Sequence, residues 1–227
     1  MKALERLSWS HYALTMILVG QFDSPFVRRV AVTLHHYHMP YTRTPISVFR
    51  NVEEVQKINP LVRVPALILE SGETLIDSSA IIDCLDEMAG PARALTPAHG
   101  PERRKVLQAI ALAMGTMDKA LVLFYERLFH IDKHINRDYE KRLLSQVNAG
   151  IAKLEDDCGA PWFFDDRFTQ ADITIGCILG YVKLRLPDVF PADRFPKLHA
   201  LALHCETKED FVKARPSPEE LAPRNAR

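Results

Sequence analysis

The residues with the clearest chemical potential lie where an apolar run gives way to a helical pattern. Residues 16–22 are apolar except for Gly20 and Gln21, which is typical of a buried strand. Asp23-Ser24-Pro25 follows, and it supplies a favoured N-cap residue and a proline suited to the first helical position. The Ser24 hydroxyl would then lie at the positive end of a helix dipole, beside N–H groups without intrahelical partners. Such a place can hold an anion, a phosphate or a thiolate, or Ser24 can be a helix cap and nothing more.

Two later segments carry residues of the same kind. Pro65 precedes the short aliphatic run 66–69, and a proline at the mouth of a strand is expected at an edge, a bulge or a cis turn. Val64 would then present its backbone N–H and C=O groups to an extended peptide, as in the addition of one strand residue. Ser78 begins a helical pattern whose N-terminus can receive a carboxylate, and Asp77 can take an ammonium close by.

The elements that must position these residues follow one order over residues 16–90. Apolar residues recur at the helical spacing i, i+3, i+4 and i+7 after Pro25, and strands are predicted over 41–46, 66–69 and 74–77. With a short helix over 49–58 and another from Ser78, the order is β-α-β-α-β-β-α. This is an α/β thioredoxin-like layout, in which the three segments described above become neighbours.

The remainder of the chain shows helical signals only. Residues 91–100 are rich in Pro, Ala and Gly and are expected to be a linker to an all-α domain, 101–216, with about five helices. The nearly apolar segment 169–186 is predicted as its core helix. Thr169 and Asp172 fit a capping box at the start of that helix, with Phe168 as the hydrophobic staple. Residues 1–15 are expected to be an N-terminal extension and 217–227 a polar tail.

The composition narrows the classes of function. Among 227 residues, Lys+Arg and Asp+Glu both number 29, so the formal net charge is zero. Nucleic acids and anionic membranes favour a basic excess, so neither is expected as a partner. We find no signal-peptide pattern, and the four widely spaced cysteines are expected to be buried thiols of a reducing compartment, neither a disulfide framework nor a zinc site. A cytoplasmic protein without a metal is the prediction.

Taken together, the chain resembles the glutathione transferase family from Met16 to about Pro216. Four motifs carry the resemblance, and each stands at the place and in the order that the family requires: DSPFVRRV, NPLVRVPALIL, LIDSSAIIDCL and FTQADI. A ligand with an amino acid head, a peptide backbone and a thiol suits the predicted neighbours, and glutathione is such a ligand. The turn lacks the Ser-Ser-Cys sequence of the zeta-type isomerases, which argues against maleylacetoacetate isomerisation.

The resemblance implies a role for each site residue. Ser24 would donate a hydrogen bond to the glutathione sulfur and favour the thiolate, which is the nucleophile. Val64 would pair with the cysteinyl backbone, and Asp77 and Ser78 would hold the γ-glutamyl end. Arg63 or Arg50 would meet the glycine carboxylate. Pro65, Thr169 and Asp172 would be structural.

The second substrate is specified less well than glutathione. Its pocket is expected between the domains, against the first helix of the second domain, although core or dimer-interface positions are equally open for these residues: Met114, Met117, Asp118, Leu121 and Tyr125. The resemblance implies a C2 homodimer and a detoxification enzyme that conjugates glutathione to a small hydrophobic electrophile or reduces peroxides with it. The alternative is a non-enzymatic glutathione-binding or scaffold protein. Thiol–disulfide exchange is disfavoured, because Ser24 and Val27 stand where cysteines would be needed.

Overall fold

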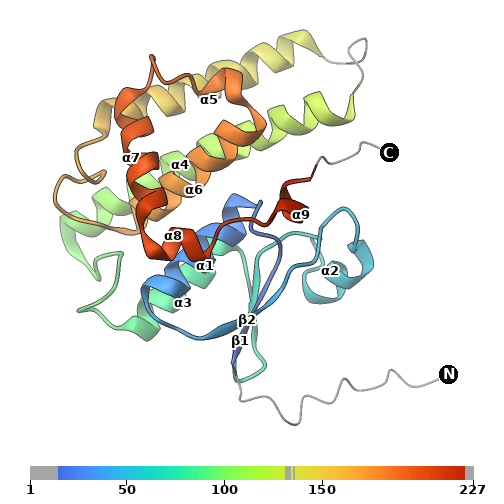
Figure 1. Cartoon of the computed structure of the whole chain (residues 1–227), viewed down its shortest axis with the longest axis vertical. Coiled ribbons are helices and arrows are strands. Elements are labelled where there is room, and N and C mark those ends of the chain that lie inside the picture. The colour runs from blue at the N-terminus through green and yellow to red at the C-terminus, as the bar shows by residue number, and fades with distance from the viewer. Residues whose placement is uncertain (1–14, 131–133, 135, 223–227) are drawn as a thin grey trace.

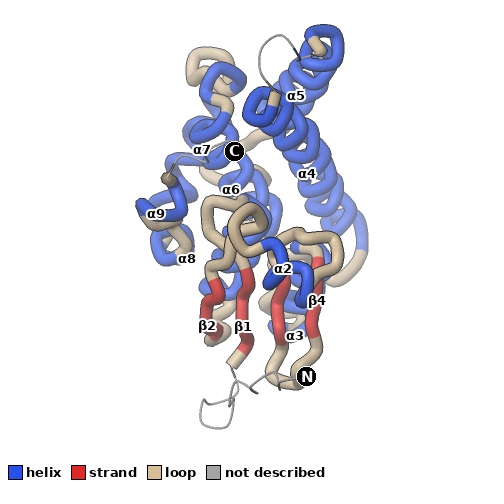
Figure 2. Tube along the Cα trace, turned by 90° about the vertical axis from the view of Figure 1, so that its right-hand side faces the viewer, coloured by secondary structure: helices blue, strands red, loops and turns tan. Residues whose placement is uncertain are grey.

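The first half of the chain is a four-stranded sheet in the order β2-β1-β3-β4, seen here in a computed structural model that describes residues 15–130, 134 and 136–222. β1 (Met16–Val19) runs parallel to β2 (Tyr41–Thr44) and antiparallel to β3 (Ala66–Ile68), which pairs with β4 (Thr74–Ile76). Helices α1 (Pro25–His36) and α3 (Ser78–Ala89) cover one face of the sheet and α2 (Val52–Ile58) lies on the other (Figures 1 and 2). This confirms the thioredoxin-like layout.

Helix α1 is the element that joins the two halves of the molecule. Its residues Val27, Val30, Ala31 and Leu34 are fully buried, as the helical spacing predicted. One side packs against α3 and the other against α6 (Gln170–Arg185) of the helical half. Arg28 anchors this contact, because its Nε–H donates to the Ala214 carbonyl at 3.0 Å and its Nη1 lies 2.7 Å from Glu206 Oε1.

The second half is helical throughout its described residues. The long antiparallel pair α4 (Gly100–Phe129) and α5 (Arg137–Asp157) packs beside α6, which is followed by the 3₁₀ turn η2 (Pro187–Val189) and by α7 (Pro196–Thr207), α8 (Glu209–Lys213) and α9 (Pro218–Leu221) (Figure 1). Helix α6 contacts α1, α4 and α7 and is buried on almost every side, which explains its nearly apolar sequence. The prediction of a core helix here is confirmed.

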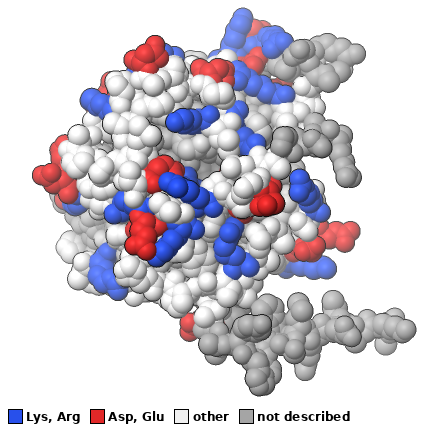
Figure 3. All heavy atoms as spheres, viewed as in Figure 1, with Lys and Arg blue, Asp and Glu red and all other residues white. Residues whose placement is uncertain are grey.

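Helix α4 has a composition that resembles a membrane span. It is 30 residues long, and its most apolar stretch reaches a mean hydropathy of 1.5. In the structure, however, α4 packs on α5 and α6 and buries Val106, Ala113 and Met117, as the central helix of a globular bundle does. The face of the molecule in Figure 3 mixes Lys and Arg with Asp and Glu, in keeping with the zero net charge.

The structure adds two local details to these expectations. Ser78 is the first residue of α3, as predicted, but it does not cap the helix: Asp77 takes the N-cap position with φ 69° and ψ 127°, and its Oδ1 accepts the N–H of Ser79 at 2.7 Å. The expected polar tail also contains a short helix, α9, in which Ser217 and Glu220 form a capping box. Both signals are present in the sequence, since Asp and Ser are both good N-cap residues and S-x-x-E marks a helix start. Nearly all of the predicted N-terminal extension lies outside the described residues.

Candidate functional site

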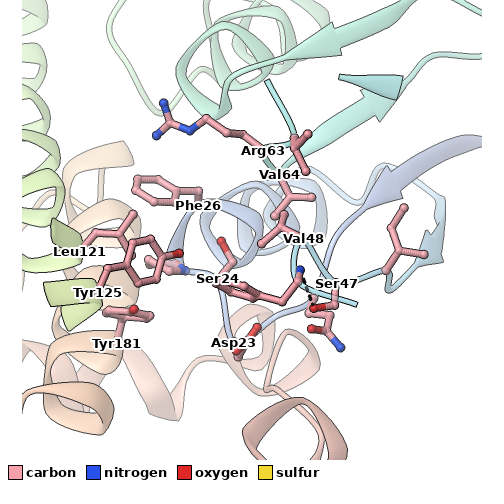
Figure 4. Close-up of a pocket in the computed structure, with 15 residues that line it drawn as sticks. Asp23, Ser24, Phe26, Ser47, Val48, Arg63, Val64, Leu121, Tyr125 and Tyr181 are labelled. Carbon is pink, nitrogen blue, oxygen red and sulfur yellow. Dashed lines mark hydrogen bonds between the residues drawn. The ribbon is translucent and has the colours of Figure 1, made fainter. Parts of the chain in front are cut away.

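A cavity of about 280 Å³ lies at the junction of the two halves (Figure 4). Its walls are the turn after β1, the loops that precede α2 and β3, and one face each of α4 and α6. The lining residues are Gln21, Asp23, Ser24, Pro25, Phe26, Ile46, Ser47, Val48, Phe49, Val62, Arg63, Val64, Leu121, Tyr125 and Tyr181. The cavity therefore has one wall rich in backbone groups and one wall rich in aromatic rings.

Ser24 stands between these two walls in Figure 4. Its backbone occupies the N-cap position of α1 with φ −79° and ψ 122°, and Pro25 is the first helical residue, as predicted. Its hydroxyl nevertheless makes no capping hydrogen bond. Because the first N–H groups of a helix lack intrahelical partners and its N-terminus carries partial positive charge, this turn can stabilise an anion in the cavity. The hydroxyl is free to donate to such an anion.

The turn that carries Ser24 is held from behind by charged groups of the helical half. Glu220 Oε1 accepts the N–H of Phe22 at 2.9 Å, and it lies 2.6 Å from Nη2 of Arg43. On the other side, Asp23 Oδ2 lies 3.2 Å from Nη2 of Arg185, and both side chains are largely buried. Phe22 and Asp23, the two residues before Ser24, are thus held by residues more than 150 positions away.

Val64 approaches this turn so closely that only glycine fits opposite it. Gly20 has φ +124°, and a Cβ atom there would lie 2.6 Å from a Val27 methyl group and 2.9 Å from Val64 Cβ. The Val64–Pro65 peptide bond is cis. Among the described residues, neither the N–H nor the C=O of Val64 has a hydrogen-bond partner, so both are available to a ligand backbone. Arg63 lies at the cavity rim without an ion pair to any described side chain.

Asp77 and Ser78 lie at the same edge of the sheet but outside the cavity lining. The register places them there, because Ala66 pairs with Val19 on one side and with Ile76 on the other. The residues that follow or precede these pairs therefore meet at that edge: Gly20, Pro65 and Asp77. A ligand that reaches from Ser24 past Val64 to Ser78 would follow this edge.

The structure divides the five residues proposed for the second-substrate pocket. Leu121 and Tyr125 line the cavity, whereas Met117 is fully buried in the core, Asp118 is exposed, and Met114 contacts Arg29 of α1. Sequence reasoning missed the rings of Phe26, Phe49 and Tyr181, which also line the cavity. The Phe49 ring lies 5.9 Å from the Tyr125 ring in an edge-to-face contact. Phe26 follows Ser24-Pro25 directly, and this position was the one available signal.

Metal chemistry finds little support in the described part of the chain. Residues 15–130, 134 and 136–222 contain no group of three or more His, Cys, Asp or Glu side chains arranged to hold an ion. The four cysteines are free thiols, and three of them are buried. Burial raises the pKa of Cys158 to about 11 and that of Cys177 to about 12, so these thiols are protonated at neutral pH.

A thioredoxin-like domain joined to a helical domain, with a cavity beside a Ser-Pro helix start, defines the class of two-domain glutathione-binding folds. The comparisons with known proteins agree. Residues 18–93 match the model of the glutathione S-transferase N-terminal domain, and residues 130–201 match that of the C-terminal domain. The chain belongs to the glutathione S-transferase family.

Individual relatives are similar to this chain over most of their length, at modest identity. The chain is 30% identical over 205 residues to the uncharacterized GST-like protein YibF of Escherichia coli, covering 88% of this chain and 98% of that protein. It is 26% identical to the maleylacetoacetate isomerase of Pseudomonas aeruginosa, covering 89% and 96%. A glutathione S-transferase of Methylobacillus flagellatus, solved with glutathione bound, superimposes with a TM-score of 0.82 at 26% identity, covering 89% of this chain and all of that one.

Proposed function

We propose that the protein binds glutathione as its thiolate at Ser24 and transfers it to a small hydrophobic electrophile in the adjoining cavity. The observation that carries this proposal is the Ser24 hydroxyl, which stands at a helix start, faces the cavity and makes no capping bond. Related structures support the choice of ligand, because the Methylobacillus flagellatus protein was solved with glutathione bound.

Ser24 needs to supply only a modest free energy of stabilisation to the glutathione thiolate. A free thiol has a pKa of about 8.5, and a fall of about two units requires about 2.7 kcal/mol of preferential stabilisation of the thiolate. One hydrogen bond to an anion supplies about 1.5–3 kcal/mol and the start of a helix about 0.3–1 kcal/mol. Ser24 and the N-terminus of α1 are together sufficient.

The other parts of glutathione would follow the sheet edge. The N–H and C=O groups of Val64 would pair with the cysteinyl backbone, Asp77 with the γ-glutamyl ammonium, and Ser78 with the γ-glutamyl carboxylate. Arg63 at the rim would meet the glycine carboxylate. The aromatic wall of Phe26, Phe49 and Tyr125 would bind the electrophile, and a homodimer would form over exposed apolar residues such as Met88 and Leu107, which are 54% and 41% exposed.

Two other reactions would use the same bound thiolate, although the missing Ser-Ser-Cys turn argues against the second. Peroxide reduction needs a thiolate and an open cavity, and both are in the proposal. Isomerisation of maleylacetoacetate is the named activity of the Pseudomonas aeruginosa relative. A non-enzymatic binding protein would bind glutathione with its thiol pKa left near the free value. Thiol–disulfide exchange would require a cysteine at Ser24.

The deciding experiment is a calorimetric titration with glutathione, followed by thiolate absorbance of the complex as a function of pH. We expect binding together with a thiol pKa at least one unit below that of free glutathione. A panel of aryl halides, organic peroxides and maleylacetoacetate then identifies the reaction. Binding with an unshifted thiol pKa would contradict the transferase proposal and support a binding protein, and no binding would contradict both.

A further inference from the structure

A second cavity, of about 510 Å³, lies in the helical half of the molecule. Residues of α6 and α7 line it together with Arg215, Pro216 and Leu221 from the end of the described chain. It shares no lining residue with the cavity beside Ser24. Its volume falls within the range of about 300–1,000 Å³ that is usual for ligand pockets. The second cavity is therefore large enough to hold a ligand of its own.

The apolar part of this second cavity is aliphatic. Leu184 of α6, Leu203 of α7 and Leu221 of α9, which we call the leucine wall, are 45%, 62% and 36% exposed. Single exposed leucines are common, but three around one cavity form an apolar surface that a ligand can cover. Phe190 is the one Phe, Tyr or Trp of the lining, and its ring already stacks on that of His199 with 4.1 Å between the centroids. The cavity therefore suits a hydrocarbon chain better than an aromatic ring.

The charged residues of the second cavity leave a positive excess. Three cations line it, Arg28, Lys183 and Arg215, against one carboxylate, Glu206. Glu206 Oε1 lies 2.7 Å from Nη1 of Arg28, and its Oε2 lies 2.9 Å from Nη2 of Arg28 and 3.6 Å from Nε of Arg215. Lys183 is exposed and forms no ion pair with any side chain that the structure describes. The two arginines thus hold the carboxylate between them, and Lys183 is available to an anion.

A narrow gap separates the second cavity from the one beside Ser24. Arg28 and Leu184 line both the gap and the second cavity, and Asp23 and Tyr181 line both the gap and the first cavity. The gap has a volume of about 40 Å³, which suits water but not a hydrocarbon chain. A chain bound in one cavity therefore does not enter the other, and both cavities can be filled at once.

We propose that the second cavity binds a free aliphatic carboxylate with a single hydrocarbon chain, its head group at Lys183 and its chain over the leucine wall. The positive excess sets the charge of the head group, and the leucines set the nature of the chain. The proposal goes beyond glutathione transfer and does not rest on it. The exposed residues proposed for the homodimer, Met88 and Leu107, belong to α3 and α4, which contribute no residue to this cavity.

The test is a calorimetric titration of the full chain with three ligands of one chain length: decanoate, its neutral isostere decanamide, and the cation decylammonium. Lys183→Glu reverses the charge at the proposed head-group site, and Leu203→Gln makes the leucine wall more polar. Lys141→Glu on α5 and Val122→Gln on α4 are the matched controls, since both residues are exposed and lie outside the cavity. All four changes are on exposed side chains, so each variant should fold, and urea unfolding verifies this.

We expect the wild type to bind decanoate more tightly than decanamide and at least tenfold more tightly than decylammonium. Lys183→Glu should weaken decanoate binding at least tenfold and change decanamide binding less than twofold. Leu203→Gln should weaken the binding of both ligands at least threefold, and both controls should match the wild type. Saturating glutathione should leave the affinity for decanoate within twofold, because the two cavities are separate.

Decanoate affinity that is unchanged in Lys183→Glu and Leu203→Gln would place the ligand elsewhere and overturn the proposal. Equal affinity of the wild type for all three ligands would also overturn it, since the cavity would then not select an anion. Absence of binding, together with self-association that is lost in Leu203→Gln, would assign the leucine wall to a second copy of the chain instead. A protein that binds decanoate as described but not glutathione would contradict the proposed function and support this site.

Discussion

Helices α1 and α6 both begin at a hydroxyl residue, and the two starts are built in opposite ways. At α6, the Thr169 hydroxyl accepts the N–H of Ala171. The Asp172 carboxylate accepts the N–H groups of Thr169 and Phe163. All of these groups are buried. At α1, the Ser24 hydroxyl is half-buried in a cavity wall and caps nothing. We call the α6 start closed, because its polar groups bond to one another, and the α1 start open, because the Ser24 hydroxyl makes no capping bond.

The largest effect is expected when the closed start is opened. Asp172→Ala removes the acceptor of two buried backbone N–H groups, so the free energy of unfolding should fall by about 2–4 kcal/mol. Urea unfolding measures this change. Asp138→Ala, which removes an exposed acid from the first turn of α5, is the control and should cost far less. If both variants lose the same stability, the box at α6 is no stronger than an ordinary helix start.

The open start should respond in the opposite manner. Ser24→Ala should change stability by no more than about 0.5 kcal/mol, because no capping bond is lost. The pKa of the bound glutathione thiol should rise by at least one unit, so kcat/KM at neutral pH should fall about tenfold or more. The pH profile of kcat/KM measures this, with Ser71→Ala in the exposed hairpin turn as the control. Identical profiles for wild type and variant would show that another donor holds the sulfur.

The support behind the open start can be tested separately. Glu220→Ala leaves the N–H of Phe22 without its acceptor and Arg43 without its ion pair, so stability should fall by about 1–2 kcal/mol. The neighbouring Glu219 is exposed, and Glu219→Ala is the matched control. Loss of the hydrogen bond to the Phe22 N–H should also raise the pKa of the bound glutathione thiol. An unchanged urea midpoint in Glu220→Ala would mean that the Glu220 contacts do not stabilise the turn.

The smallest effect is expected for the reactivity of the buried thiols of the helical half. Cys205 Sγ lies 3.7 Å from the Asp172 carbonyl oxygen, and burial raises its pKa, as it does for Cys177 and Cys158. Less thiolate is present at any given pH, so these three thiols should react with a disulfide reagent only on unfolding at pH 8. A cysteine introduced at the open start by Ser24→Cys should react at once in the folded protein. Rapid reaction of all the native thiols would contradict the burial described here.

Turn chemistry and apolar spacing predicted the order of elements, and the thioredoxin-like layout that this order matches placed Ser24, Val64 and Ser78 at one edge. The choice among α4 residues was not predictable in this way. Met117 and Leu121 are four positions apart on one apolar stripe, yet Met117 is in the core and Leu121 lines the cavity. Spacing identifies a buried face but not the neighbour that covers it.

Helix α9 was missed for a related reason. Four residues are too few to show a helical period, and the burial of Glu220 depends on a contact with Phe22 that lies 198 positions earlier. The S-x-x-E pattern at Ser217–Glu220 is the one local signal for this helix. Short elements whose stability comes from distant partners are the ones that local patterns predict least well.

That same contact sets the time at which the site can be completed in the cell. Phe22 is synthesised 198 positions before Glu220, and translation proceeds at about 5–20 residues per second. Roughly 10–40 s therefore separate the two groups, given the 198 positions between them. Once β4 has been made, the sheet and α1 can form, but the Glu220 carboxylate that accepts the Phe22 N–H is not yet present. The turn before Ser24 therefore gains this hydrogen bond only when α9 has been synthesised.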